Sequence, residues 1–275
     1  IRTLGRVDHK DAFLDTDTLE KARGITIFSK QALLTAGNTG ITLLDTPGHV
    51  DFSTETERTL QVLDYAVLVV SGTDGVQSHT ETLWRLLRRY HVPTFVFVNK
   101  MDLPGKSREE LLAQLNHRLG EGFVAFDVPQ ADRDEALALC DENLMDRMLD
   151  AGQLTDADLI PAVARRHVFP CWFGSALRRT ENDALESVDA LLDGIDRYTR
   201  PAPALDAFGA KVFKVSQDEQ GTRLTWLRVT GGELKVKAQL SGEADGEPWE
   251  EKANQLRLYS GVKYTLAEAI GPGQV

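Results

Sequence analysis

Short apolar runs alternate with helix-like segments along residues 1–200. The apolar runs predict strands at Ile41–Asp45, Ala66–Ser71, Thr94–Val98 and Val168–Phe173. Such unbroken runs are typical of parallel strands that helices cover on both faces. Apolar residues at helical spacing follow in two stripes: Leu83, Leu86, Leu87 and Tyr90, then Leu185, Val188, Leu192 and Ile195. The alternation predicts βαβ units and an α/β fold with a doubly wound, mostly parallel sheet.

The pattern changes twice beyond this core. Residues 131–164 predict a helical insertion between the last two strands, with helices around 137–149 and 156–163. Arg200–Leu205 contains two prolines and predicts a short, stiff linker. Apolar residues then alternate with period two, which predicts strands at Lys211–Val215, Thr222–Val229, Glu233–Leu240 and Gln255–Tyr259. We therefore expect one domain over 1–199 and a small antiparallel β domain over 206–275.

Composition excludes several classes of protein. The chain carries 31 Lys and Arg against 42 Asp and Glu, a net charge of −11, so a fully basic nucleic-acid coat is excluded. No stretch approaches the roughly 20 apolar residues that a membrane helix needs, and the first residues show no apolar run of the kind found in secretory signals. Cys140 and Cys171 are too few for a disulfide framework and indicate a reducing compartment. We expect a cytoplasmic protein.

Two motifs directly follow predicted strands. They are D-T-P-G-H at Asp45–His49 and N-K-M-D at Asn99–Asp102. In open α/β sheets, ligands bind at the carboxyl ends of the strands, which is where both motifs lie. Two unrelated loops with capping residues are the alternative, but strand context and chain order favour one shared site.

The N-K-M-D segment has the chemistry of a guanine site. The Asp102 carboxylate can accept hydrogen bonds from the N1–H and the exocyclic amine of guanine, whereas adenine would leave it unpaired. Asn99 can bridge the base edge to neighbouring loops. The aliphatic stem of Lys100 can lie over the ring face.

The D-T-P-G-H segment fits the phosphate end of a nucleotide. Asp45 is placed to hold Mg²⁺ through water. Gly48 lets the backbone approach a terminal phosphate, and His49 can orient an attacking water. In R-G-I-T-I at Arg23–Ile27, the Thr26 hydroxyl can reach Mg²⁺, although Thr26 could equally begin a strand over 25–29.

A fourth segment, G-S-A-L at Gly174–Leu177, closes a predicted strand. Its backbone N–H groups can meet the guanine carbonyl. Together the four motifs resemble the G domain of translational GTPases, a phosphate-loop NTPase-like fold. Ile41–Ser53 and Asp64–Gln77 are similar to the elongation factor G group. The length between Asp102 and Ser175, with L-G-R-V-D near the start, looks most like tetracycline-resistance ribosomal protection proteins.

This resemblance implies a set of residue roles. Thr26 and Gly48 would sense the γ-phosphate, with Thr26 and Asp45 at Mg²⁺, and His49 would be the ribosome-activated catalytic residue. The resemblance implies that the guanine of GTP or GDP would be held by Asn99, Lys100, Asp102, Ser175, Ala176 and Leu177. Leu177 departs from the lysine often found there, at a position where the family uses backbone contacts. Residues 206–275 would form the β-barrel domain that follows the G domain.

One expected motif is missing. The sequence has no G-x-x-x-x-G-K-[ST] phosphate loop. Gly105–Ser107 imitates its last three residues but follows N-K-M-D, so we interpret it as a solvated loop and helix N-cap. We expect that the first strand and phosphate loop are missing from this chain and that the barrel is cut short. Alone, the chain should bind GTP weakly or not at all and be inactive as an enzyme.

The resemblance implies a ribosome-dependent GTPase in which hydrolysis drives a switch in ribosome binding. Tetracycline ribosomal protection and elongation factor G-like translocation both fit, as does recycling of release factors. A ribosome-binding pseudo-GTPase without turnover stays open as an alternative, whereas His49 and the β domain disfavour a small regulatory GTPase. We expect the ribosome, its RNA and its proteins, as partner, with no membrane or DNA contact, and a monomer. Lys235 and Lys237, on one predicted strand face, are candidates for contact with ribosomal RNA phosphate.

Overall fold

The computed structural model describes residues 26–27, 29–177, 186–218, 220–244 and 246–275. The L-G-R-V-D segment, residues 23–25 of R-G-I-T-I, and Leu185 of the second helical stripe lie outside this range. Contacts divide the described chain into two compact units. The first unit holds the described residues up to 34, with 40–62 and 201–275, and the second holds 35–39 and the described part of 63–200. The domain limits expected from the sequence stay a prediction.

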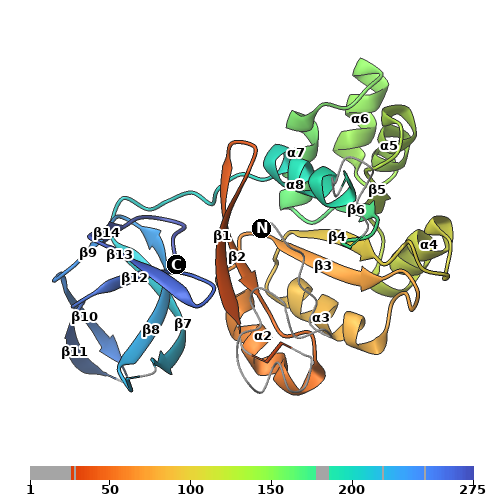
Figure 1. The fold of residues 1–275 in the computed structure, drawn as a ribbon. Coiled ribbons are helices and arrows are strands. Elements are labelled where there is room, and N and C mark those ends of the chain that lie inside the picture. The colour runs from red at the N-terminus through yellow and green to blue at the C-terminus, as the bar shows by residue number, and fades with distance from the viewer. Residues whose placement is uncertain (1–25, 28, 178–185, 219, 245) are drawn as a thin grey trace. The chain divides into compact units, whose positions relative to one another are not determined.

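The second unit is built on a parallel sheet. Its strands are β3 (Ala66–Ser71), β4 (Thr94–Asn99), β5 (Phe123–Ala125) and β6 (Phe169–Phe173), in the order β3-β4-β6-β5 (Figure 1). All three pairings are parallel. β6 is buried throughout and β4 along all but its last residue, which explains their unbroken apolar sequences. The predicted parallel α/β architecture is confirmed.

Helices connect these strands. α3 (Ser78–Arg89) links β3 to β4, and α4 (Arg108–Leu119) links β4 to β5. Three helices separate β5 from β6: α5 (Gln130–Ala138), α6 (Glu142–Ala151) and α7 (Asp156–Ala164). After β6 comes α8 (Glu186–Tyr198). Among the helices of the described chain, none is long and apolar enough to cross a membrane.

The prediction of a single helix over 137–149 is wrong. α5 ends at Ala138, and α6 starts after Asp141, whose carboxylate accepts from the N–H groups of Asn143 (2.8 Å) and Leu144 (3.3 Å). This side-chain cap satisfies amides that have no intrahelical partner, so the chain can start a new helix there. β5 was not predicted, because three residues carry no readable period.

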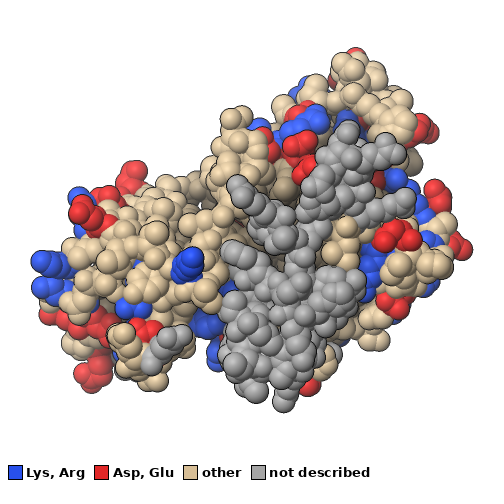
Figure 2. All heavy atoms as spheres, in the orientation of Figure 1, with Lys and Arg blue, Asp and Glu red and all other residues tan. Residues whose placement is uncertain are grey.

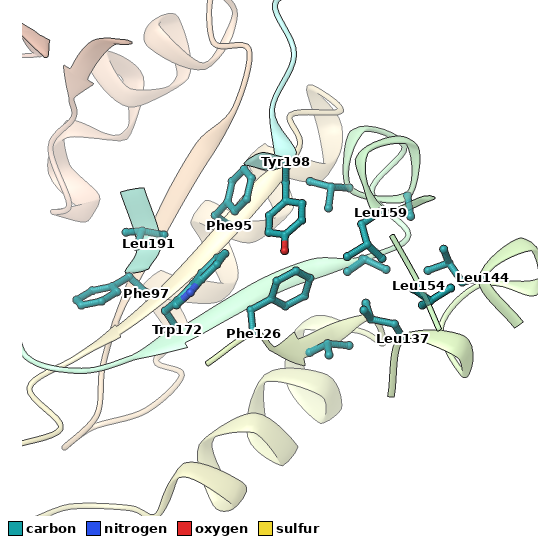
Figure 3. Packing of buried hydrophobic residues seen from close by; sticks show 14 residues of the cluster. Phe95, Phe97, Phe126, Leu137, Leu144, Leu154, Leu159, Trp172, Leu191 and Tyr198 are labelled. Atoms are coloured by element: carbon teal, nitrogen blue, oxygen red, sulfur yellow. The ribbon is translucent and has the colours of Figure 1, made fainter. Parts of the chain in front are cut away.

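The core of the second unit lies where the insertion meets the sheet. Phe95 and Trp172 come from neighbouring strands, and Phe126 and Tyr198 pack edge to face with ring centres 5.3 Å apart (Figure 3). Leucines from all three insertion helices and the loop between them complete the cluster: Leu137, Leu144, Leu154 and Leu159. The insertion therefore packs against the parallel sheet and shares its hydrophobic core.

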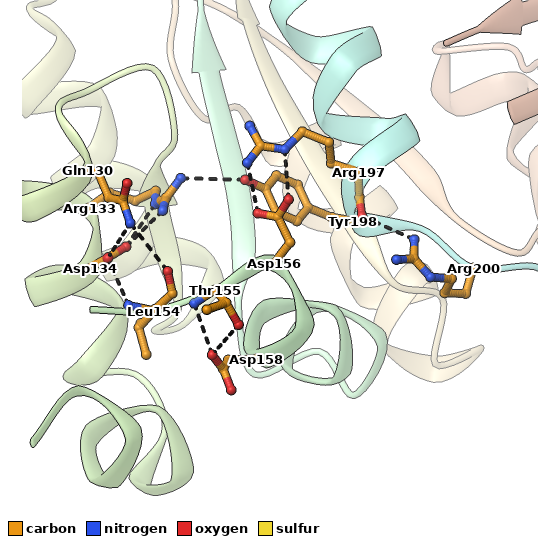
Figure 4. A network of polar contacts seen from close by, with 10 residues as sticks. All are labelled: Gln130, Arg133, Asp134, Leu154, Thr155, Asp156, Asp158, Arg197, Tyr198 and Arg200. Atoms are coloured by element: carbon orange, nitrogen blue, oxygen red, sulfur yellow. Dashed lines mark hydrogen bonds and ion pairs between the residues drawn. The ribbon is translucent and has the colours of Figure 1, made fainter. Parts of the chain in front are cut away.

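A buried carboxylate stabilises the insertion. Asp134 is 1% exposed and accepts hydrogen bonds from the guanidinium of Arg133 (2.9 Å), the amide of Gln130 (3.2 Å) and the N–H of Leu154 (3.0 Å) (Figure 4). These contacts tie α5 to the loop before α7. A buried charge is tolerated because its hydrogen-bonding capacity is satisfied.

The first unit contains a β hairpin, a helix and an antiparallel β domain. β1 (Lys30–Ala36) pairs with β2 (Thr39–Asp45), and their turn, with the adjoining strand ends (residues 35–39), belongs to the second unit. The helical turn η1 (Val50–Phe52) and helix α2 (Ser53–Leu60) follow. The interpretation of Thr26 as part of a strand over 25–29 is wrong for the described residues 26, 27 and 29, since β1 begins at Lys30.

The predicted antiparallel β domain is confirmed. It comprises β7 (Gly209–Gln217), β8 (Arg223–Gly231), β9 (Leu234–Lys235), β10 (Gln239–Ala244), β11 (Glu247–Lys252), β12 (Leu256–Ser260), β13 (Lys263–Ala267) and β14 (Ala269–Ile270). The pairs are β7–β8, β10–β11, β12–β13 and β9–β14. Its core is Val229, Leu234, Leu256 and Ile270. On the face drawn in Figure 2, Lys and Arg side chains of this domain are interspersed with Asp and Glu.

The predicted strand Glu233–Leu240 is interrupted. Lys237 has a φ of 66°, in the left-handed region, and its N–H donates to the carbonyl of Ala253 (2.7 Å). Lys235 lies in β9 and pairs with Glu233 (3.1 Å). Because a turn separates the two lysines, they do not form the expected cationic face of one strand.

Candidate functional site

The carboxyl end of β4 carries the N-K-M-D segment. Asn99 is the last residue of β4, and its side-chain oxygen accepts hydrogen bonds from the N–H groups of Lys100 (2.8 Å) and Ala176 (2.9 Å). The N–H of Met101 donates to the carbonyl of Gly174 (3.1 Å). The structure therefore brings together the two loops that the sequence assigned to guanine, because β4 and β6 are parallel neighbours whose ends meet at one edge.

The backbone of this loop presents Asp102 outward. Lys100 has a φ of 65°, and its carbonyl accepts from the N–H of Leu103 (3.1 Å), which closes a tight turn. Lys100 and Asp102 are both at the surface. Within the described part of the chain, the Asp102 carboxylate makes no hydrogen bond or ion pair, so both oxygens can accept from a ligand.

The G-S-A-L loop is held from two sides. Ser175 is 9% exposed; its hydroxyl accepts from the N–H of Leu177 (3.3 Å), and its carbonyl accepts from the hydroxyl of Ser187 (3.4 Å). The N–H of Ala176 already donates to Asn99. The conformation of this loop is therefore fixed by hydrogen bonds within the protein.

A third loop, which sequence reasoning did not include in the site, supports the N-K-M-D segment. It comprises residues 71–75 and begins at the last residue of β3, the other neighbour of β4. The N–H of Gly72 donates to the carbonyl of Asn99 (2.7 Å). Hydrogen bonds from the hydroxyls of Ser71 (2.7 Å) and Thr73 (3.0 Å) lower the pKa of the Asp74 carboxyl. The D-G-V-Q sequence at residues 74–77 was the feature of the sequence that could have identified this loop as part of the site.

The Gly105–Ser107 segment has the structural role that the sequence indicated. A Cβ at Gly105 would lie 2.9 Å from the carbonyl oxygen of Gly72, so a side chain would not fit there. Lys106 donates to the carbonyl of Asp74 (2.9 Å). Ser107 is the N-cap of α4 and forms a capping box with Glu110. The tripeptide is thus a loop and helix cap.

The D-T-P-G-H segment lies in the first unit, between β2 and α2. Asp45 is the last residue of β2. The hydroxyl of Thr56, in α2, donates to the carbonyl of Pro47 (2.9 Å) and holds the loop against the helix. Gly48 is exposed, with open space where a Cβ would be.

His49 is half exposed and oriented by its own segment. Its Nδ1 accepts from the N–H of Asp51 (3.3 Å) and lies 3.5 Å from the Asp51 carboxylate. The ring centre is 6.1 Å from that of Phe52. Because the backbone occupies Nδ1, Nε2 is the ring nitrogen that can hold a water.

The side chains predicted to bind a metal ion offer oxygen ligands. The Thr26 hydroxyl and the Asp45 carboxylate both suit Mg²⁺, which typically takes one or two protein ligands and completes its shell with water and substrate phosphates. The described residues contain no group of three or more His, Cys, Asp or Glu that could hold a metal ion by themselves. Thr26, Asp45, Gly48 and His49 belong to the first unit, and the guanine-site residues to the second. Their convergence on one nucleotide stays a prediction.

The amino-acid sequence is similar to those of known proteins. The family described as the elongation factor Tu GTP binding domain matches residues 1–201. The tetracycline resistance protein TetM of Streptomyces lividans is 35% identical, over 93% of this chain and 44% of its own length. The oxytetracycline resistance protein of Streptomyces rimosus is 37% identical, over 86% and 39%. Elongation factor G 2 of Syntrophus aciditrophicus is 27% identical, over 99% and 49%.

The fold has a close counterpart among solved structures. A crystal structure of a protein from Thermus thermophilus matches with a TM-score of 0.82 and 25% identity, over 100% of this chain and 47% of that one. The chain thus spans less than half the length of each of these relatives.

Proposed function

Because the chain belongs to the elongation factor Tu GTP-binding domain family, we propose that the protein is a translational GTPase. It binds GTP and GDP with Mg²⁺, hydrolyses GTP on the ribosome and uses the loss of the γ-phosphate to change its affinity for the ribosome. The observation that supports this most directly is the Asn99 carboxamide. It joins the N-K-M-D and G-S-A-L loops while Asp102 stays exposed beside them.

Base recognition follows from this arrangement. The Asp102 carboxylate accepts from N1–H and the exocyclic amine of guanine, and the Lys100 stem covers one ring face. The Asn99 amide group can donate to the base edge while its oxygen keeps the loops together. Ser175, Ala176 and Leu177 shape the wall facing the guanine carbonyl.

Hydrolysis takes place at the other end of the nucleotide. The Gly48 N–H donates to the γ-phosphate, and Nε2 of His49 orients the attacking water. Thr26 and Asp45 would hold the metal ion, Asp45 through water. When bound, Mg²⁺ would supply positive charge that stabilises the charge developing on the phosphate oxygens. When the γ-phosphate departs, Thr26 and Gly48 lose a common partner, and their segments are released.

Among the translational GTPases, ribosomal protection against tetracycline is the role we favour. The two Streptomyces relatives named for tetracycline and oxytetracycline resistance are 35% and 37% identical, against 27% for the elongation factor G 2 relative. The ribosome, through its RNA and proteins, is then the partner, and the protein acts as a cytoplasmic monomer without contact to membrane or DNA.

A ribosome-dependent GTPase assay of the full-length gene product tests the proposal. GTP turnover should be slow alone and rise on addition of ribosomes, and the protein should restore translation in the presence of tetracycline. Turnover that ribosomes do not stimulate would contradict the GTPase role. Stimulated turnover without restored translation would contradict ribosomal protection and favour a translocation role.

A further inference from the structure

A partly buried polar cluster joins three segments of the first unit. We call it the Glu55 cluster; it comprises Ser29, Glu55, Thr59 and Lys214. Nζ of Lys214, in β7, lies 2.7 Å from Oε1 of Glu55, in α2. The same oxygen accepts from the N–H of Ser29 (3.2 Å), just before β1, and the Ser29 and Thr59 hydroxyls are 2.9 Å apart.

The burial of this ion pair sets it apart from surface pairs. The side chains of Glu55 and Lys214 are each 15% exposed, whereas those of Arg223 and Glu251 in the same unit are 62% and 58% exposed, with 3.5 Å between the charged groups. An exposed pair contributes little, but a buried charge that loses its partner is strongly destabilised. Lys214 therefore confines α2 to positions in which Glu55 can reach it.

Two members of the Glu55 cluster, Ser29 and Glu55, lie close in sequence to residues of the proposed reaction or to residues that hold them. Ser29 lies three positions beyond Thr26 along the chain. Glu55 is in the first turn of α2, and the adjacent Thr56 donates to the carbonyl of Pro47, inside the D-T-P-G-H loop. The same helical turn thus contacts the segment after Thr26, the loop that carries His49, and the β domain.

The β domain also holds the far end of α2. Nη1 of Arg228, in β8, donates to the carbonyl of Val62 (3.0 Å), two residues past the end of the helix. β7 and β8 are paired strands, and Lys214 lies opposite Trp226. One hairpin of the β domain therefore contacts both ends of α2, so the helix cannot shift without straining a contact to that hairpin.

We propose that Glu55 and Lys214 form a positioning pair that transmits the state of the γ-phosphate to the β domain. This inference rests on the proposed GTPase function. With GTP bound, Thr26 and Gly48 share the γ-phosphate, and the Glu55 cluster is closed. After phosphate release, the segments of Thr26 and His49 move, the contact between Ser29 and Glu55 loosens, and β7 responds through Lys214. In this proposal Glu55 and Lys214 have no direct role at the nucleotide; they act on the position of the residues that bind it.

A natural fluorophore lies beside the cluster. The ring centre of Trp226 is 6.0 Å from Nζ of Lys214 and 4.8 Å from that of Tyr259. Its indole N–H donates to the hydroxyl of Ser216 (2.8 Å). A displacement of the Lys214 ammonium changes the field at the indole, so Trp226 emission reports on the pair.

The test uses the full-length gene product and three variants: Glu55→Gln, Lys214→Met, and the exchange Glu55→Lys with Lys214→Glu. The measured quantity is the difference in tryptophan emission between the GDP complex and the complex with a non-hydrolysable GTP analogue. The part of this difference that disappears in Trp226→Phe is the Trp226 signal. We expect each single variant to bind GDP normally, to lose this signal, and to lower ribosome-stimulated kcat about tenfold. The exchange should restore part of both. The matched control, Glu251→Gln with Arg223→Met, should change neither.

The possible outcomes separate the inference from the proposed function. Retention of the Trp226 signal and of kcat in both single variants, with GDP still bound, overturns the inference and leaves the GTPase role standing. A wild-type protein that binds no guanine nucleotide overturns both. If the single variants fail to fold, Glu55→Gln combined with Lys214→Met removes both charges at once. Loss of the signal in this double variant supports the inference, and its retention overturns it.

Discussion

The side-chain oxygen of Asn99 offers the sharpest test of the guanine site. It accepts two hydrogen bonds, 2.8 Å from the N–H of Lys100 and 2.9 Å from that of Ala176. Asn99→Ala removes both and leaves two amides without partners. At about 1 kcal/mol for each hydrogen bond, we expect a loss of about 2 kcal/mol in loop organisation, or roughly 30-fold weaker GDP binding.

Asn99→Asp separates the two roles of this side chain. It keeps an oxygen acceptor for both amides but removes the donor available to the base. Hydrogen exchange of the Ala176 backbone amide should therefore be faster in Asn99→Ala and near the wild-type rate in Asn99→Asp. GDP titration of the full-length gene product should show weaker binding in both variants. Ser187→Ala is the matched control, because it removes only a 3.4 Å contact to the same loop. Unchanged exchange at Ala176 in Asn99→Ala would refute the reasoning.

Four further predictions concern other residues. Asp102→Asn replaces an acceptor with an amide and should shift preference from guanine toward xanthine nucleotides in competition binding; persistent guanine selectivity would place the base elsewhere. His49→Ala should leave GDP affinity intact but lower ribosome-stimulated GTP turnover by about 10²-fold or more, and equal turnover would remove His49 from the mechanism. Asp134→Ala leaves the largely buried Arg133 without its carboxylate partner and should lower the free energy of unfolding, measured with urea, by about 3–5 kcal/mol, against little change for the exposed Asp132→Ala. Burial raises the pKa of the Cys171 thiol far above its usual range, so iodoacetamide at pH 8 should modify it only after unfolding; rapid labelling of the native protein would contradict its burial.

Elements with strong local signals were predictable. β4 and β6 are unbroken apolar runs because both of their faces are covered. The capping box at Ser107 depends only on residues close together in the sequence. Elements that depend on distant pairing were not. β5 is a strand because it pairs with β6, and Lys237 leaves the strand pattern because its N–H finds the carbonyl of Ala253.

The candidate site divides in the same way. Residue types and order alone predicted a guanine site at Asn99, Lys100 and Asp102, since base recognition requires those groups in a short segment after a strand. The 71–75 loop was missed as a part of the site, because its hydrogen bond to Asn99 joins two backbone groups. Hydrogen bonds between backbone groups place few demands on residue type, so the amino-acid sequence gives little indication of them.

From its sequence alone, this protein could be assigned a parallel α/β sheet, an antiparallel β domain and the residues suited to guanine, phosphate and Mg²⁺. These properties depend on periodicity and on short motifs, which act over a few neighbouring residues. Only the tertiary structure decided that Asn99 holds Ala176, 77 positions later, and that Lys214 meets Glu55 across 159 positions. Such partners are chosen by which strands and helices pack together. Read along the chain, Glu55 and Lys214 each look like an ordinary charged side chain on a surface.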